Sequence, residues 1–153
     1  QFSYELIPNW KDLSIEDKAL VDKAHEALEA AYAPYSNFKV GAAVRLGDDS
    51  IITGSNQENA AYPSGLCAER VALFYIGANF PKHSIDTICI VAKGDLIPED
   101  KLLSPCGACR QVMLETENRQ KNKIRVIIVN RDHRTMIVSS VIDLLPFGFG
   151  SKH

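Results

Sequence analysis

Two segments dominated by β-branched and other apolar residues constrain the fold more than any other feature. They cover 85–92 and 124–129. A strand that lacks alternating polar residues has both faces covered, as central strands do when helices pack on each side of a sheet. The two runs therefore predict a layered α/β domain in which helices form the crossovers.

Apolar residues at helical spacing predict helices over about 14–32, 66–77 and 106–117. The first of these helices begins at Ser14, which has Asp17 three positions later. That spacing is typical of a capping box, in which the Asp17 carboxylate bonds back to the backbone of Ser14. The helices alternate with strand segments, as the α/β interpretation requires.

Three further segments have strand character, and one more resembles a helical turn. The residues 38–46 and 50–54 predict a β-hairpin, and 135–138 a short return strand after 124–129. A last helical turn is expected over 141–145. The sequence thus predicts five strands in all.

Length and charge narrow the functional classes. The chain has 153 residues, which suits one compact domain over 1–153. A formal net charge of -2 argues against a nucleic-acid polymer as partner. No apolar run reaches the ~20 residues that cross a bilayer. The first ten residues do not resemble a secretory signal, and four cysteines without disulfide spacing indicate a reducing compartment, so we expect a cytoplasmic protein.

Two cysteine motifs each open a predicted helix: Cys67-Ala68-Glu69 and Pro105-Cys106-Gly107-Ala108-Cys109. The free N–H groups and partial positive charge of a helix start favour the thiolate, which is the metal-binding form of cysteine. If the two helices lie side by side on one sheet face, their starts converge. We therefore expect Cys67, Cys106 and Cys109 to hold one zinc ion.

Three protein ligands leave a tetrahedral zinc ion one open position, which is typical of a catalytic site. A water molecule there becomes hydroxide near neutral pH, and Glu69 is placed to take its proton and pass it on. This pattern is that of zinc nucleobase deaminases, so the motifs predict hydrolytic deamination. Three thiolates and Zn²⁺ leave one net negative charge, and we hypothesise that Arg70 offsets it by hydrogen bonds to sulfur.

Simpler interpretations remain for the cysteines. Cys106 and Cys109 alone could be a redox pair, although neither Pro105 nor a separate Cys-x-Glu is needed for that. A structural zinc site would need a fourth ligand. The candidates are Cys89, His25, His83, His133 and His153. Cys89 lies within an apolar strand and is expected to be a buried, inert thiol.

Five blocks of the chain resemble cytidine deaminases of the small homotetrameric type, which contain one zinc ion per subunit. They cover 33–43, 56–63, 65–70, 104–112 and 144–149, nearly the whole chain in the family's order. The resemblance implies a three-layer α/β/α domain with a central mixed five-stranded sheet. It also implies a homotetramer with active sites shared between chains.

The resemblance further assigns substrate-binding roles. Asn56 and Glu58 match the pair that binds the ribose 3′-hydroxyl, although on their own they read equally well as a self-capping polar loop. Phe38 matches the aromatic residue that packs on the pyrimidine ring, whereas strand periodicity alone makes it a core residue. The backbone of Ala68 is implied to contact the base, and Phe149 to reach a neighbouring subunit's site.

The implied activity is deamination of cytidine and deoxycytidine to uridine and deoxyuridine plus ammonia, in pyrimidine salvage. The chain does not rank the two substrates. One alternative is a deaminase of a modified cytosine nucleoside, of the blasticidin S type. Another is a non-catalytic, zinc-stabilised nucleoside-binding protein, which would have no use for Glu69.

Overall fold

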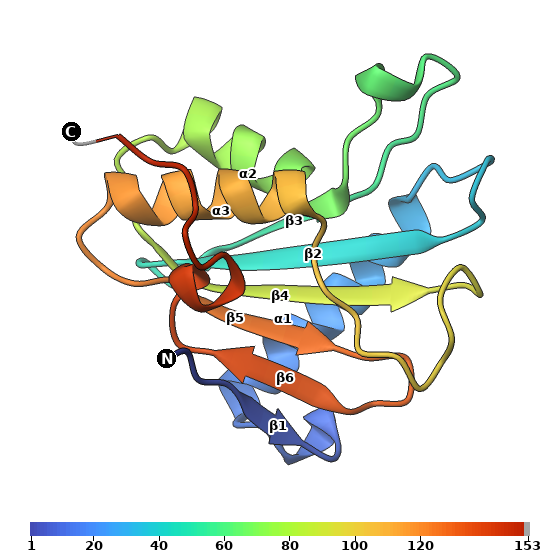
Figure 1. Ribbon diagram of the computed structural model, residues 1–153, viewed down its shortest axis with the longest axis horizontal. Coiled ribbons are helices and arrows are strands. Elements are labelled where there is room, and N and C mark those ends of the chain that lie inside the picture. Colours follow the sequence, from blue (N-terminus) through green and yellow to red (C-terminus); the bar gives the residue numbers. More distant parts are fainter. Residues whose placement is uncertain (152–153) are drawn as a thin grey trace.

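A single mixed sheet of six strands organises the chain, in the order β1-β6-β5-β4-β2-β3 (Figure 1). The structure is a computed structural model and describes residues 1–151. Strands β4 and β5 are parallel, and the other neighbours are antiparallel. The strands are β1 (Glu5–Ile7), β2 (Lys39–Leu46), β3 (Ile51–Ser55), β4 (Ile85–Lys93), β5 (Arg125–Val129) and β6 (Thr135–Val138).

Three α-helices cover the two faces of this sheet. Helix α1 (Ile15–Ala27) packs on one face, while α2 (Ala68–Asn79) and α3 (Gly107–Arg119) lie side by side on the other (Figure 1). Within residues 1–151 there are also four short 3₁₀ helices: Trp10–Asp12, Leu28–Ala30, Tyr62–Ser64 and Val141–Leu144. The predicted three-layer α/β/α architecture is confirmed. No helix within the described residues has the length and apolar character that crossing a membrane requires.

The continuous apolar run of β4 has a direct explanation in these layers. Ile88 and Ile90 belong to the hydrophobic core under α2 and α3. Cys89 and Val91, which alternate with them, belong to the separate core under α1. Because both faces of the strand are buried over 88–91, no position in that stretch is left for a polar residue, and Asp86, nearer the strand start, is exposed.

The predicted strand count of five was wrong, because β1 adds a sixth strand. It pairs antiparallel with β6, with Leu6 opposite Met136. Its three residues are too short for an alternation pattern, and Leu6 remains 45% exposed. The strand therefore forms only because the edge of β6 offers it backbone partners.

The first helix also differs from the prediction. It ends at Ala27 and tightens into the 3₁₀ turn, and the Tyr32 N–H already donates to the Asn56 carbonyl, 2.9 Å away. Ser14 does cap the helix, accepting from the Asp17 N–H at 3.2 Å. The reciprocal half of the capping box is absent, because the Asp17 carboxylate instead pairs with Arg45 and Arg125, at 3.1 and 2.7 Å.

Candidate active site

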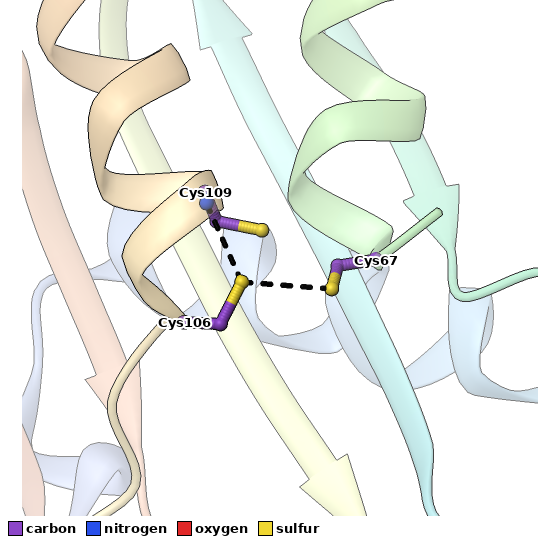
Figure 2. Close-up of side chains that lie close together, drawn as sticks. All are labelled: Cys67, Cys106 and Cys109. Atoms are coloured by element: carbon purple, nitrogen blue, oxygen red, sulfur yellow. Dashed lines mark hydrogen bonds between the residues drawn. The ribbon is translucent and has the colours of Figure 1, made fainter. Parts of the chain in front are cut away.

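The starts of α2 and α3 bring three cysteines together, as the sequence predicts. Cys67 is the N-cap residue of α2 and Cys106 that of α3, while Cys109 lies in the first turn of α3. Their sulfur atoms all lie within 4.8 Å of one another. Figure 2 shows the three side chains turned toward the space between the two helix starts.

The spacing of these sulfurs fits a tetrahedral metal ion. The Sγ atoms of Cys67 and Cys106 are 3.8 Å apart. A zinc ion with Zn–S bonds of about 2.3 Å holds two tetrahedral sulfurs roughly 3.8 Å apart. Gly54 of β3 lets α2 come close enough, because a Cβ at that position would lie 2.6 Å from the Ala68 carbonyl oxygen.

Electrostatics at the cluster favour a thiolate even without a metal. Hydrogen bonds from the Cys109 thiol, and then from Arg70, outweigh burial and lower the pKa of Cys67 to about 5. The pKa of Cys109 is raised in turn, first because of its hydrogen bond with Cys67. The cluster is thus already partly deprotonated at neutral pH, which favours binding of a divalent cation.

Glu69 lies directly against this cluster, in the first turn of α2. It is 4% exposed, and its Oε2 atom is 3.4 Å from Sγ of Cys109. Burial raises the pKa of its carboxyl group. A raised pKa makes the protonated form of a buried carboxyl group easier to reach, so the group can both accept and return a proton, as general acid–base chemistry requires.

Arg70 lies beside the cysteine cluster, where the sequence predicts a positive charge that offsets the thiolates. Its Nη2 atom donates to Sγ of Cys67 at 3.6 Å, and this hydrogen bond raises the pKa of Arg70. Its Nε atom is buried without a hydrogen-bond partner. A buried N–H group with no partner is costly, so this donor indicates that a negative group belongs beside it.

A fourth protein ligand is absent from the metal-binding group that the described residues form. That group consists of the three cysteines alone. Cys89 is fully buried in the core under α1, on the other face of the sheet, and burial raises the pKa of its thiol. His153, one of the candidates, lies outside the described residues. The three-ligand arrangement leaves a metal one open position.

A cavity of about 570 Å³ opens beside the cluster, a size that suits a small organic ligand. Cys67 and Arg70 line it, and so do Asn56 and Glu58. The remaining lining residues are Tyr35, Ser36, Gln57, Asn59, Tyr62, Pro63, Gly65 and Leu66.

Asn56 and Glu58 lie at this cavity but also hold the local backbone. The Asn56 amide donates to the Phe38 carbonyl and accepts from the Val40 N–H, both at 2.8 Å. The Glu58 carboxylate accepts hydrogen bonds from the backbone N–H groups of Tyr35 and Ser36 and from the Ser36 hydroxyl, in the loop just before β2. The self-capping interpretation of these two residues thus describes real contacts, and their substrate-binding roles stay predictions.

Phe38 is placed mainly as a core residue. It is 9% exposed, belongs to the core under α2 and α3, and is absent from the cavity lining. Gly94 supports it, because a Cβ at Gly94 would lie 2.6 Å from the Asn37 carbonyl oxygen and 3.2 Å from the Phe38 ring. At φ +131° this position also favours glycine on backbone grounds.

Phe149 does not reach the cavity of its own chain. It is 81% exposed, and its carbonyl oxygen accepts a hydrogen bond from Gln111 of α3 at 2.9 Å. Phe147 nearby is exposed too. The backbone at Phe149 is therefore held on α3, while its side chain is exposed and is not part of the cavity lining.

Ser36 and Tyr35 are cavity residues to which the sequence assigned no role. Both belong to the block 33–43 that carries the resemblance. Nothing in their spacing indicates that they contact Glu58, which is 22 positions away from Ser36 in the chain. Only the folded arrangement of the two loops identifies that contact.

Comparisons with known proteins agree with this geometry. A family model described as the cytidine and deoxycytidylate deaminase zinc-binding region matches residues 14–137. Among curated proteins, the chain is 43% identical over 101 residues to a cytidine deaminase of Halalkalibacterium halodurans, covering 66% of this chain and 72% of that one. It is 33% identical over 127 residues to a cytidine deaminase of Mycobacterium tuberculosis, covering 83% and 84%.

Solved structures give the same result for the fold. The crystal structure of cytidine deaminase from Burkholderia pseudomallei superposes with a TM-score of 0.74 at 38% identity. The match covers 90% of this chain and 100% of that chain. The structure from Mycobacterium tuberculosis gives 0.66 at 29% identity, with 90% and 100% covered.

Proposed function

This chain belongs to the cytidine and deoxycytidylate deaminase family, and we propose that it deaminates cytidine and deoxycytidine by hydrolysis. The products are uridine or deoxyuridine and ammonia, which places the reaction in pyrimidine salvage. One observation supports this above the others. The three cysteine sulfurs lie within 4.8 Å of one another, with the buried Glu69 carboxylate 3.4 Å from one of them.

Cys67, Cys106 and Cys109 hold the zinc ion in this proposal. When bound, zinc supplies the activation of a water molecule as a nucleophile at neutral pH. The thiolates fix the position of the ion against the starts of α2 and α3, which belong to one packed layer. The open side of the site faces the cavity, since Cys67 is part of the cavity lining.

Glu69 moves the protons of the reaction. Its carboxylate accepts a proton from the attacking water and delivers it to the ring nitrogen of the pyrimidine. It then takes the second proton of that water and gives it to the amino group, which leaves as ammonia. Burial suits Glu69 to this role, because it raises the pKa of the carboxyl group. The N–H group of Ala68 begins α2 and has no partner within the helix, so it is free to contact the base.

Arg70 offsets the negative charge of the thiolates. Its contact with Cys67 and its unpartnered Nε atom support this role. With the guanidinium group beside the sulfurs, the site comes closer to neutrality than three thiolates and Zn²⁺ would alone. A less negative site holds a more acidic water molecule.

The cavity accommodates the nucleoside. Asn56 and Glu58 bind the 3′-hydroxyl of the sugar, and their position in the cavity lining supports this. Phe38 packs on the pyrimidine ring. Because Phe38 is only 9% exposed in this structure, its ring edge must become more accessible when substrate binds.

The active form is a homotetramer whose sites are shared between chains. Exposed aromatic residues support an extensive interface. They include Tyr62, Phe74, Tyr75, Phe147 and Phe149. Phe149 completes a site in a neighbouring subunit, since its ring is 81% exposed and lies outside its own chain's cavity. The whole chain acts as one catalytic domain.

An ultraviolet assay with a substrate panel tests the function. Purified, zinc-loaded protein is mixed with cytidine, deoxycytidine, adenosine, cytosine and blasticidin S. Loss of absorbance with the first two alone is the expected result. Turnover of blasticidin S alone would favour the modified-nucleoside alternative. No turnover of any compound by a fully zinc-loaded sample would favour a binding protein.

A further inference from the structure

The hydroxyl group of Ser36 joins two residues of the proposed substrate site. Its Oγ atom donates to Oε2 of Glu58 at 2.6 Å and accepts from the Phe38 N–H at 3.0 Å. Ser36 itself is half-buried and lines the cavity. It is therefore positioned between a residue proposed to bind sugar and one proposed to pack on the base.

The Phe38 N–H fixes the direction of this hydroxyl group. A serine hydroxyl has one hydrogen to donate and two lone pairs with which to accept. The Phe38 N–H donates to one lone pair of the Ser36 oxygen. The hydroxyl hydrogen of Ser36 is therefore available to donate to Glu58. The Phe38 backbone is itself fastened on its carbonyl side by the Asn56 amide at 2.8 Å, so the arrangement has little freedom to turn.

The acceptor sites of Glu58 are nearly filled by the same loop. Its Oε1 atom accepts from the N–H groups of Tyr35 and Ser36, at 3.0 and 3.2 Å. Its Oε2 atom accepts from the Ser36 hydroxyl. An ionised carboxylate has about four acceptor sites. Three protein donors thus leave one site, on Oε2, at a residue that lines the cavity.

We propose that Ser36 is a positioning residue, which aims the remaining acceptor site of Glu58 at a hydroxyl group of the nucleoside's sugar. This inference rests on the proposed function. Ser36 acts through Glu58 and does not take part in the chemistry at the pyrimidine ring. The ligand group at this point is a hydrogen-bond donor, because the carboxylate offers only acceptors. A phosphate group on the same sugar position would be repelled.

The charge state of Glu58 agrees with this role. The hydrogen bond from the Ser36 hydroxyl is the main factor that lowers the pKa of Glu58, against a smaller effect of desolvation. Glu58 is therefore ionised at neutral pH and accepts rather than donates. Hydrogen bonds between a charged and a neutral group are stronger than those between two neutral groups. Misorienting the Glu58 carboxylate should therefore weaken substrate binding measurably.

The test compares cytidine with 3′-deoxycytidine, which lacks the sugar hydroxyl in question. In Ser36→Ala, kcat/KM for cytidine should fall about tenfold, mostly through KM, while kcat/KM for 3′-deoxycytidine should change by less than about threefold. Ser36→Cys keeps the side-chain size but is a weak donor, so it should show the same selective loss. Ser36→Thr, which retains the hydroxyl group, should discriminate between the two substrates as the wild type does.

Ser50→Ala is the matched control. Ser50 makes the same kind of hydrogen bond, from Oγ to Oδ1 of Asp48 at 2.6 Å, but in the turn at the far end of β2. It should leave both substrates unaffected. In a Glu58→Gln background, Ser36→Ala should cause no further loss of discrimination, since both act through one contact.

Two results would overturn the inference while leaving the proposed function intact. One is kcat/KM that stays at the wild-type value for both substrates in Ser36→Ala. The other is an equal loss on both substrates, which would indicate a general structural role, for example through Phe38. Wild-type protein that fails to deaminate cytidine would instead overturn the proposed function, and this inference with it.

Discussion

Oε2 of Glu69 lies 3.4 Å from Sγ of Cys109, although 40 positions separate the two residues in the chain. The contact joins the first turn of α2 to the first turn of α3, and it exists because the two helices lie side by side on one face of the sheet. The carboxylate proposed to transfer protons and a sulfur of the candidate metal site are thereby held by two helices rather than by loops.

Replacing Glu69 by Gln should separate metal binding from chemistry. Glutamine has the same shape but does not shuttle a proton, so kcat should fall at least about 100-fold. Zinc content and melting temperature should stay close to wild type, because Glu69 is not one of the three sulfur ligands. Metal analysis, thermal unfolding and the ultraviolet assay measure these three quantities. Glu29→Gln, at an exposed carboxylate, is the control and should change none of the three quantities. Near-normal turnover in Glu69→Gln would remove Glu69 from the mechanism.

Replacing Arg70 by Ala should weaken the site without removing a ligand. The Cys67 sulfur would lose the hydrogen bond at 3.6 Å, and the thiolates would lose their compensating charge. We expect turnover or zinc affinity to fall about 10- to 100-fold. Zinc titration against a chelator and steady-state kinetics measure the two effects. Arg119→Ala, at the exposed end of α3, should change neither. Unchanged zinc affinity and turnover in Arg70→Ala would refute the role.

The metal site was predictable because its chemistry is local. Each cysteine motif sits at a helix start, and a helix start is visible in sequence as the onset of helical spacing. The convergence of the two starts then followed from the layered α/β architecture. The same holds for β4, whose apolar run indicates burial on both faces without any knowledge of its partners.

Features that depend on distant contacts were not predictable. Strand β1 has no pattern of its own and exists through pairing with β6. The capping-box expectation failed because Asp17 pairs with Arg45 and Arg125, which are 28 and 108 positions away. Ser36 went unassigned for the same reason, since its partner Glu58 belongs to another loop.

The Asp17 ion pairs should make stability depend on acid pH. Burial would raise the pKa of Asp17, but hydrogen bonds from Arg125 and then Arg45 outweigh it, so the pKa lies below its ordinary value. A group with a lowered folded-state pKa stabilises the protein above its unfolded-state pKa of about 3.9, and this stabilisation is lost as pH falls through the folded-state value.

Asp17→Asn should therefore lower the free energy of unfolding at pH 7 by about 2 kcal/mol, a figure reduced from that of a fully buried pair because Arg125 is partly exposed. The deficit should shrink below about pH 4, where wild type loses the same stabilisation. Denaturant unfolding at several pH values and fixed protein concentration measures it. Asp22→Asn, at an exposed position of the same helix, is the control. An equal deficit at pH 7 and pH 2.5 would contradict the ion-pair explanation.

The proposal that sites are shared between chains predicts that two defective variants rescue each other. Phe149 is 81% exposed and lies outside its own chain's cavity, so Phe149→Ala should raise KM by damaging a neighbour's site. A Glu69→Gln chain has an intact Phe149 but no proton shuttle. Mixed tetramers of the two variants should contain sites that combine Glu69 from one chain with Phe149 from the other. The kcat/KM of the mixed sample should therefore exceed the sum of the kcat/KM values of the two variants measured separately, severalfold. Phe147→Ala, at the neighbouring exposed aromatic residue, should leave KM near wild type. Strictly additive activity in mixtures shown by native mass spectrometry to be mixed oligomers would place each active site within a single chain.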